Sequence, residues 1–159
     1  MIDPERLHRL AFFGLFSKDH CEAIAEIADE EEVPEGITLF EEKQHSNALY
    51  FLIEGYIDLY QKSFDSYYPT LSKDLLVGAV HPREIFGLSA LVEPYIYKAT
   101  ARTAQPCTYI KFDAAKLREL IEEDCHLGFL FMREISLAFR DRLMDSRVQL
   151  AAAWVESQK

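Results

Sequence analysis

The spacing of apolar residues changes twice along the chain and divides it into three parts. In the first part, apolar residues recur at helical spacing over residues 6–13. Ser17 is a suitable N-cap for a second helix, which the pattern predicts over residues 18–28. The chain therefore opens with two predicted helices.

The middle of the chain has short runs rich in β-branched and aromatic residues, separated by turns with glycine or proline. The runs cover residues 37–40, 48–53, 56–61, 75–80, 98–104 and 108–112. Glu54-Gly55 predicts a tight hairpin between two of them, and residues 63–73, with Tyr67 and Tyr68, predict an exposed hairpin tip. Many short strands at regular spacing favour a sandwich or barrel.

Helical spacing returns at the C-terminal end. Asp113 is a predicted N-cap for a helix over residues 114–122, and a longer helix is predicted over residues 127–155. Apolar residues lie on more than one face of this last helix, which predicts burial on more than one side. One side can pack on the strands, and the simplest partner for the other is the same helix of a second copy, so we expect a homodimer.

Composition narrows the class of protein. The chain has 159 residues, of which 49% are hydrophobic and 28% charged, which predicts one folded domain over residues 1–159. We divide it into N-terminal helices (1–30), a β-rich part (31–112) and C-terminal helices (113–159). A net charge of −10 without a basic stripe argues against direct binding of nucleic acid. No apolar run is long enough to cross a bilayer and no signal peptide is evident, so we expect a cytoplasmic protein without a membrane partner.

Metal and catalytic sites are not predicted. The three cysteines form no CxxC pair, and the five histidines show no metal-ligand spacing. These residues are Cys21, Cys107, Cys125, His8, His20, His45, His81 and His126. A haem-based gas sensor is therefore disfavoured. Absence of Soret absorbance in the purified protein would exclude it. No nucleophile elbow or Walker loop is present, so we expect no enzyme.

The order of the elements, together with several short motifs, resembles the cyclic-nucleotide-binding domains of the catabolite-activator and fumarate-nitrate-reduction regulator family. The matching segments are residues 10–16, 33–36, 48–57, 85–91, 98–102 and 113–117. The resemblance implies a mainly β fold with flanking helices. Its centre is a double-stranded β-helix, a jelly-roll-like β-roll, between N-terminal helices and a long C-terminal helix.

The resemblance also implies a ligand site, the phosphate-binding cassette. In this family a strand ends in Phe-Gly, and the amides at the start of the next helix face the cyclic phosphate. Phe86 and Gly87 hold that place here, and Leu88, Ser89 and Ala90 begin the helix. The alternative is that Gly87 only serves a tight strand-to-helix turn.

Two side chains of the family's site are replaced. Leu88 stands where the family has the glutamate that binds the ribose. The arginine that pairs with the phosphate is replaced by Tyr97, or by Lys98 if the preceding loop differs by one residue. A lysine can neutralise phosphate but cannot pair with it in a bidentate way. Losing both contacts should weaken a nucleotide about a hundredfold or more.

Further candidates surround this site. Ser89 either offers a hydroxyl to an anion or caps its own helix. Ala99 and Thr100, which follow Lys98, are also candidate ligand-binding residues. Thr100 either reaches a ligand or is only a residue suited to a strand. Ser146 and Arg147 are placed on the long helix where the family contacts the base. No cofactor is required, and the ligand is a cyclic nucleotide, another small anion, or none.

The resulting hypothesis is an effector-sensing regulatory module for signal transduction. Ligand binding would shift a hinge near residues 122–128 and the long helix, and the output would pass to a protein partner. The alternative is a fragment or degenerate member of a DNA-binding transcriptional regulator of the same family.

Overall fold

Three short helical segments open the chain: α1 (Pro4–Arg9), the 3₁₀ helix η1 (Ala11–Phe13) and α2 (Lys18–Glu26). The structure, a computed structural model, describes residues 1–64 and 72–159. The sequence predicted one helix over residues 6–13, but Leu10 adopts an extended backbone and separates α1 from η1. Ser17 caps α2 as predicted, because its hydroxyl accepts a hydrogen bond from the His20 amide at 3.1 Å.

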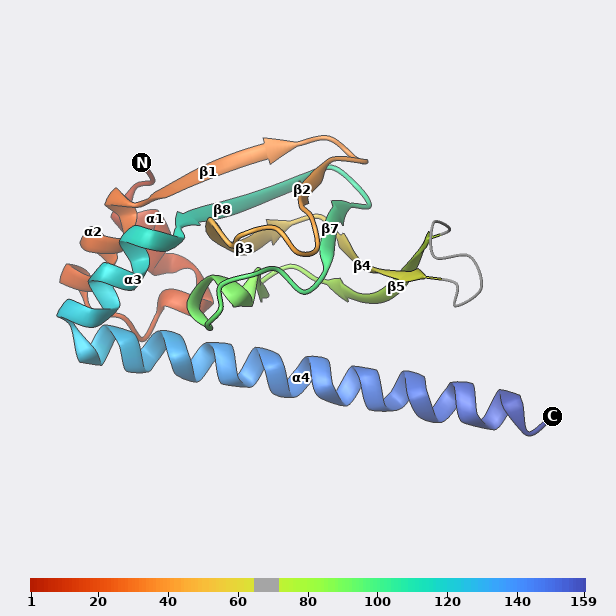
Figure 1. Cartoon of the computed structure of the whole chain (residues 1–159). Helices are drawn as coiled ribbons and strands as arrows, with labels where there is room; N and C mark the ends of the chain where they lie inside the picture. The colour runs from red at the N-terminus through yellow and green to blue at the C-terminus, as the bar shows by residue number, and fades with distance from the viewer. Residues whose placement is uncertain (65–71) are drawn as a thin grey trace.

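In the described residues, eight strands form two four-stranded antiparallel sheets (Figure 1). The first sheet has the order β1 (Ala28–Val33), β8 (Cys107–Asp113), β3 (Ala48–Glu54) and β6 (Ile85–Phe86). The second has the order β2 (Thr38–Phe40), β7 (Thr100–Thr103), β4 (Ile57–Phe64) and β5 (Ser72–Val80). One buried core takes side chains from both sheets, so they pack face to face and confirm the predicted β-roll.

The roll begins three residues earlier than predicted. The sequence pattern predicted no strand before residue 37, yet the acidic run from Asp29 to Glu32 forms most of β1. Arg6 of α1 donates to Glu30 at 2.7 Å, and the Tyr109 hydroxyl donates to Glu31 at 2.6 Å. These partners from other elements explain how an acidic run is held in a strand at the edge of the sheet.

The predicted hairpin at Glu54-Gly55 is wrong. β3 and β4 lie in different sheets, so the chain crosses from one sheet to the other at this point. Gly55 has φ of 105°, and a Cβ there would lie 2.5 Å from the Cys107 Sγ. Glycine is needed here because the backbone turns a corner against β8.

The β4–β5 hairpin is confirmed as far as the structure describes it, since β4 continues to Phe64 and β5 starts at Ser72. The rest of the predicted tip, including Tyr67 and Tyr68, lies outside the described residues. The strand predicted over residues 98–104 is shorter, because β7 begins at Thr100.

Two helices end the chain: α3 (Ala114–Glu123) and the long α4 (Cys125–Ser157). Asp113 caps α3 as predicted, by accepting from the Lys116 amide at 2.9 Å. α4 runs alongside the roll, and its C-terminal end points away from the N-terminal helices (Figure 1). Its buried side chains all come from its first third: Leu127, Leu130, Phe131 and Ile135.

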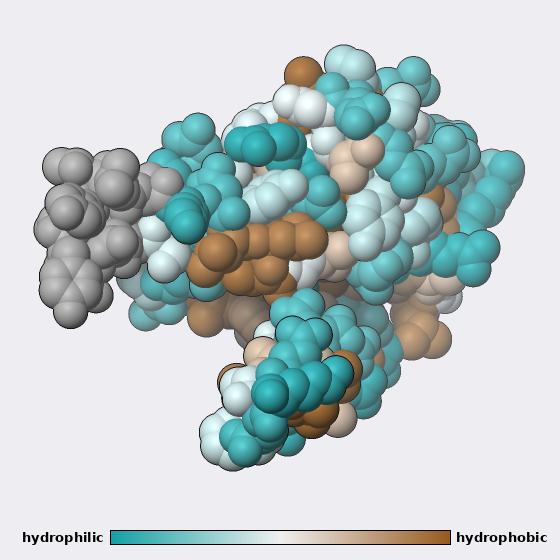
Figure 2. Space-filling view, turned by 90° about the vertical axis from the view of Figure 1, so that its right-hand side faces the viewer, coloured by the Kyte–Doolittle hydropathy of each residue, from teal (hydrophilic) through white to brown (hydrophobic). Residues whose placement is uncertain are grey.

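The second half of α4 exposes large apolar side chains on more than one face of the helix. Figure 2 looks at this end of the molecule and shows hydrophobic side chains on the helix and on the neighbouring side of the roll. On α4 they are Leu143, Met144, Val148, Leu150, Trp154 and Val155, and on β5 they are Leu75 and Leu76. The wide apolar surface predicted for the last helix is therefore buried by the chain itself only near the start of α4.

A second core lies between the helices and the outer face of the β1–β8–β3–β6 sheet. It is rich in phenylalanine: Phe13, Phe16, Phe51, Phe112 and Phe131. This core fixes the N-terminal helices and the start of α4 against the sheet that carries β6. Within residues 1–64 and 72–159, no helix has the length and apolar character of a membrane span.

Candidate functional site

The turn at Gly87 has the backbone geometry that the sequence predicted for the start of a cassette. β6 ends at Phe86, Gly87 has a left-handed φ of 71°, and the 3₁₀ helix η2 (Leu88–Leu91) follows at once. A Cβ on Gly87 would lie 3.1 Å from the Tyr50 ring and 3.2 Å from the Ala48 carbonyl oxygen. The left-handed φ and the close approach of β3 both favour glycine.

The first amides of η2 have no acceptor within their own helix. This holds for Leu88 and Ser89, because the first turn of any helix leaves its N–H groups without an intrahelical partner. Gly87 occupies the N-cap position and no side chain caps η2, so the alternative role of Ser89 as a cap is wrong. The half-buried Ser89 thus remains beside the open amides.

The interior of the roll next to this turn is filled by aromatic rings. Tyr97 is 4% exposed, and its ring stacks on Phe40 with centroids 3.9 Å apart and planes 13° apart. Tyr50 stacks on Phe86 at 5.0 Å and also contacts Phe40 at 5.5 Å. Four rings from β2, β3, β6 and the segment before β7 therefore occupy the space beside the cassette.

The Tyr97 hydroxyl is fully engaged with β3. It donates to the Ala48 carbonyl oxygen at 2.7 Å and accepts from the Ala48 amide at 3.2 Å. A Cβ on Gly87 would lie 3.5 Å from the Tyr97 Cε1, so the ring faces the turn directly. Burial raises the pKa of the Tyr97 phenol, against an opposite effect of the Ala48 hydrogen bond. The side chain that faces the turn is thus a neutral phenol.

Lys98 points away from the roll. Its side chain is exposed, and its carbonyl oxygen accepts from the Gln61 Nε2 at 3.0 Å. Ala99 packs against the inner core, and the Thr100 hydroxyl accepts from the Glu42 amide at 3.0 Å. Of the two alignments that the sequence left open, the structure places Tyr97, not Lys98, opposite Gly87.

Leu88 faces the other core. It is 4% exposed and belongs to the cluster that the helices share with the outer face of the sheet. The residue that the resemblance aligned with the family's glutamate therefore offers no polar group and does not point into the roll. This side of the candidate site consists of apolar packing.

Ser146 and Arg147 are not brought to the cassette. Both are exposed and lie in the half of α4 that has no buried residue. Arg147 instead lines a shallow apolar hollow with Leu150, Trp154 and Val155 on the helix surface.

Two arginines that the sequence did not single out hold the two sides of the cassette. The Arg118 Nη1 of α3 donates to the Ala90 carbonyl oxygen at 2.6 Å, and its guanidinium lies 4.2 Å from the centre of the Tyr95 ring. The Arg142 Nη2 of α4 donates to the Ile85 carbonyl oxygen at 3.2 Å. The two partners are 28 positions apart in the sequence for the Arg118 contact and 57 positions apart for the Arg142 contact. No local motif could therefore have predicted these contacts.

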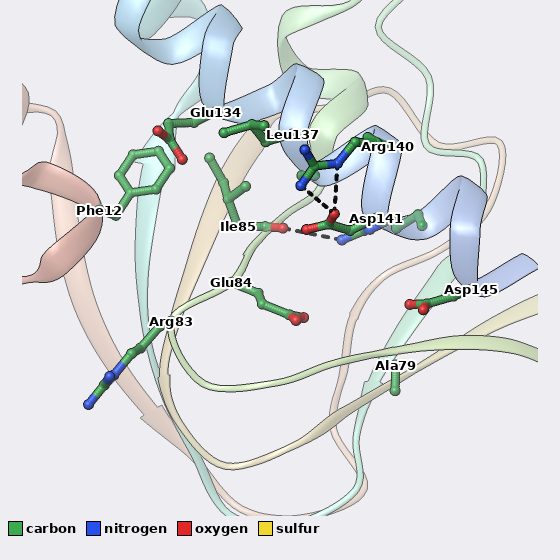
Figure 3. A pocket seen from close by; sticks show the side chains of 12 residues that line it. Phe12, Ala79, Arg83, Glu84, Ile85, Glu134, Leu137, Arg140, Asp141 and Asp145 are labelled. Atoms are coloured by element: carbon green, nitrogen blue, oxygen red, sulfur yellow. Dashed lines mark hydrogen bonds and ion pairs between the residues drawn. The ribbon is translucent and has the colours of Figure 1, made fainter.

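A cavity of about 230 Å³ lies beside Arg142, between the β5–β6 turn, η1 and α4 (Figure 3). Its wall includes the apolar side chains of Phe12, Ile85 and Leu137, and the carboxylates of Glu84 and Asp145. The cavity touches the strand that leads into the cassette, but none of residues 86–91 or 97–100 lines it.

The histidines and cysteines form no metal centre in the described part of the chain. His20 pairs with Asp124 at 2.8 Å, and the His126 ring lies 5.7 Å from the His20 ring. Within residues 1–64 and 72–159, no group of three or more histidine, cysteine, aspartate or glutamate residues is arranged to hold a metal ion.

Comparison with solved structures finds the same fold in bacterial proteins. One of them, described as a "Putative Cyclic nucleotide-binding protein" from Geobacter metallireducens, is 32% identical, with 90% of this chain and 99% of that chain covered and a TM-score of 0.75. The sensor domain of the transcriptional regulator DNR from Pseudomonas aeruginosa is 18% identical, with 85% and 91% covered and a TM-score of 0.64.

The c-di-GMP-responsive global regulator CLP from Xanthomonas campestris is 15% identical, with 85% of this chain but only 63% of that chain covered, and a TM-score of 0.67. A search of curated protein sequences found no match. The family profile described as "Cyclic nucleotide-binding domain" matches residues 30–124, more than half of the chain. The chain therefore belongs to the cyclic nucleotide-binding domain family and shares its fold with the DNR sensor domain and the regulator CLP.

Proposed function

We propose that this chain is a non-catalytic regulatory domain in which the state of the cassette controls the position of α4. The observation that carries the proposal is the pair of arginine contacts. Arg118 binds the backbone of η2, and Arg142 binds the backbone of β6 one residue before Phe86. A change at Gly87 would therefore reach both C-terminal helices. The cassette and α4 would move together between two conformations, and a ligand could shift the populations of these conformations.

The ligand of the roll differs from the family's usual one in this proposal. The open amides of Leu88 and Ser89 suit a small anion. A cyclic nucleotide would also have to displace the Tyr97 ring from Phe40, and it would meet this tyrosine rather than an arginine opposite Gly87. We expect cyclic nucleotides to bind weakly, and the physiological effector to be another small anion or none.

The output in this proposal passes through protein contacts made by α4, in a homodimer located in the cytoplasm. Leu137, Met144, Val148 and Val155 recur every four or seven residues and are all more than one third exposed. A parallel second copy would cover this stripe. A further protein partner would receive the signal, without direct nucleic acid binding by this domain.

Titration calorimetry with cyclic AMP tests the role given to Tyr97. For the wild-type chain we expect no measurable binding at micromolar ligand. For Tyr97→Arg we expect affinity to rise about tenfold or more, because a charged hydrogen bond to phosphate becomes available. Lys98→Ala is the matched control and should behave as wild type. Tight binding by the wild type that Lys98→Ala abolishes would contradict the proposal.

Transcriptional output is the second candidate function. Its support is the fold shared with the DNR sensor domain and with the regulator CLP, both at low identity. In this alternative the domain would act on DNA through a separate DNA-binding segment or partner, since its own net charge is −10. Purifying the complete gene product and measuring its binding to its own promoter region would separate this candidate from a purely protein-directed output.

A further inference from the structure

We propose that the cavity between the β5–β6 turn and α4 is a second ligand site, which takes a small zwitterion: a free amino acid with an aliphatic side chain. The inference goes beyond the proposed function, because it does not depend on what the roll binds. Three features of the cavity carry it: a cation with spare donors, two carboxylates that face each other, and an apolar wall.

The cation is Arg142. Its guanidinium makes one hydrogen bond, to the Ile85 carbonyl oxygen, and no ion pair within 4.0 Å among the described residues. Burial lowers the pKa of Arg142, and Glu84 and Asp145 act in the opposite direction from longer range. A partly desolvated guanidinium with unused donors is suited to a carboxylate, which it can bind in a bidentate way.

The carboxylates are Glu84 and Asp145. Their side chains point toward each other across the cavity (Figure 3). The neighbouring Arg140 is already paired with Asp141 at 2.9 Å, so this pair adds little net charge. Arg83 and Glu134 also line the cavity, but the Arg83 side chain points away from the two carboxylates (Figure 3), and Glu134 pairs with Arg133 at 3.4 Å. In the space between the remaining groups, Arg142 with Glu84 and Asp145 leaves an excess of one negative charge. An ammonium group between the two carboxylates balances that excess, whereas a simple anion would be repelled.

The apolar wall sets the kind of side chain. Phe12, Ile85 and Leu137 line one side of the cavity. The volume of about 230 Å³ falls below the ~300–1,000 Å³ of sites for drug-sized ligands, and so disfavours a nucleotide. A carboxylate on Arg142, an ammonium between the two acids and an aliphatic group on the wall together describe an amino acid such as leucine.

Such a ligand would join α4 to the cassette. Arg142 and Asp145 belong to α4, while Glu84 and Ile85 lead directly into Phe86 and Gly87. A zwitterion between them would add charged contacts to the hydrogen bond that Arg142 already makes with the Ile85 carbonyl oxygen. Its occupancy would favour the arrangement in which α4 lies against β6.

Titration calorimetry on the full chain with three matched compounds tests the site. We expect L-leucine to bind with a Kd of about 1 mM or tighter. Isoamylamine, which lacks the carboxylate, and isocaproate, which lacks the ammonium, should each bind at least about tenfold more weakly. Arg142→Gln and Asp145→Asn should each lose L-leucine binding, and the exposed Lys98→Ala should keep it. Circular dichroism verifies that each variant is folded.

Three results would overturn the inference. The first is no binding of L-leucine to the folded wild-type chain. The second is isoamylamine binding as tightly as L-leucine, which would indicate a site for amines. The third is L-leucine binding that persists in Asp145→Asn, which would place the amino acid elsewhere. Asp145 is exposed, so this variant decides the matter even if Arg142→Gln fails to fold.

Discussion

Single residues decide what the cassette can hold, and Gly87 is the first of them. Its left-handed φ of 71° and the contacts that a Cβ would make at 3.1 and 3.2 Å both oppose any side chain. We expect Gly87→Ala to lower the free energy of unfolding by more than about 1 kcal/mol, measured by urea denaturation. Gly14→Ala is the matched control: its Cβ would lie at an ordinary 3.5 Å from its nearest neighbour, so little loss is expected. Equal losses in the two variants would contradict this role of Gly87.

Tyr97 is the second such residue. Tyr97→Phe keeps the ring on Phe40 but leaves the Ala48 amide without its acceptor. We expect a loss of about 1–3 kcal/mol in the free energy of unfolding. Tyr60→Phe removes a hydroxyl whose one hydrogen bond among the described residues is to the half-buried Asp58, and should change stability by no more than about 0.5 kcal/mol. If Tyr97→Phe leaves the free energy of unfolding unchanged, the hydroxyl contact does not stabilise the fold.

Sequence reasoning found these residues but not their arrangement. The motif around Phe86 and Gly87 predicted the turn, because only glycine suits its backbone. It could not choose between Tyr97 and Lys98, since the length of a loop does not say which of two neighbours points inward. The packing of Tyr97 on Phe40 joins residues far apart in sequence, and no local pattern records it.

At the scale of elements, the start of α4 depends on one carboxylate. Asp124 accepts from the amides of His126 and Leu127 at 3.0 and 3.1 Å and pairs with His20. The hydrogen bond from the Leu127 amide, and next the His20 pair, lower the pKa of Asp124. The charged form is therefore favoured in the folded state. Its contribution is complete above the ordinary carboxyl pKa and is lost as the pH falls through the lowered value.

Asp124→Asn should therefore weaken the acid dependence of stability, because asparagine still caps a helix but does not titrate. Thermal unfolding followed from neutral pH to below the usual range of carboxyl pKa values measures the slope. Asp19→Asn is the control, since the exposed Asp19 side chain makes no hydrogen bond in the part of the chain that the structure describes. We expect Asp19→Asn to keep the wild-type dependence of stability on pH. If Asp124→Asn also keeps it, the role given to Asp124 is wrong.

Helices and strands were predicted well where the local sequence pattern alone determines them. They were predicted poorly where contacts with residues far away in the sequence determine the structure. Ser17 and Asp113 mark their helices by side-chain chemistry alone, and both caps are present. The acidic strand β1 was missed, because its stability depends on Arg6 and Tyr109. Glu54-Gly55 suggested a hairpin, although only tertiary structure shows that β3 and β4 belong to different sheets.

At the scale of the whole molecule, we expect assembly to depend on the exposed half of α4. We expect the mass from light scattering to be twice that of one chain, because a second copy can cover the stripe around Val148. Val148→Asp should shift the mass toward a single chain. Gln149→Asp, on the neighbouring polar face, should leave it unchanged. A wild-type mass of one chain at every concentration would remove the dimer from the account.

The central claim for the molecule is that its own Tyr97 takes the place of a cyclic nucleotide in the roll. An NMR titration of the uniformly ¹⁵N-labelled chain with cyclic AMP observes the amides of Gly87, Leu88 and Ser89 directly. The account predicts no saturable change at these amides at micromolar ligand. Saturable shifts of all three amides, together with release of the Tyr97 ring from Phe40, would contradict it.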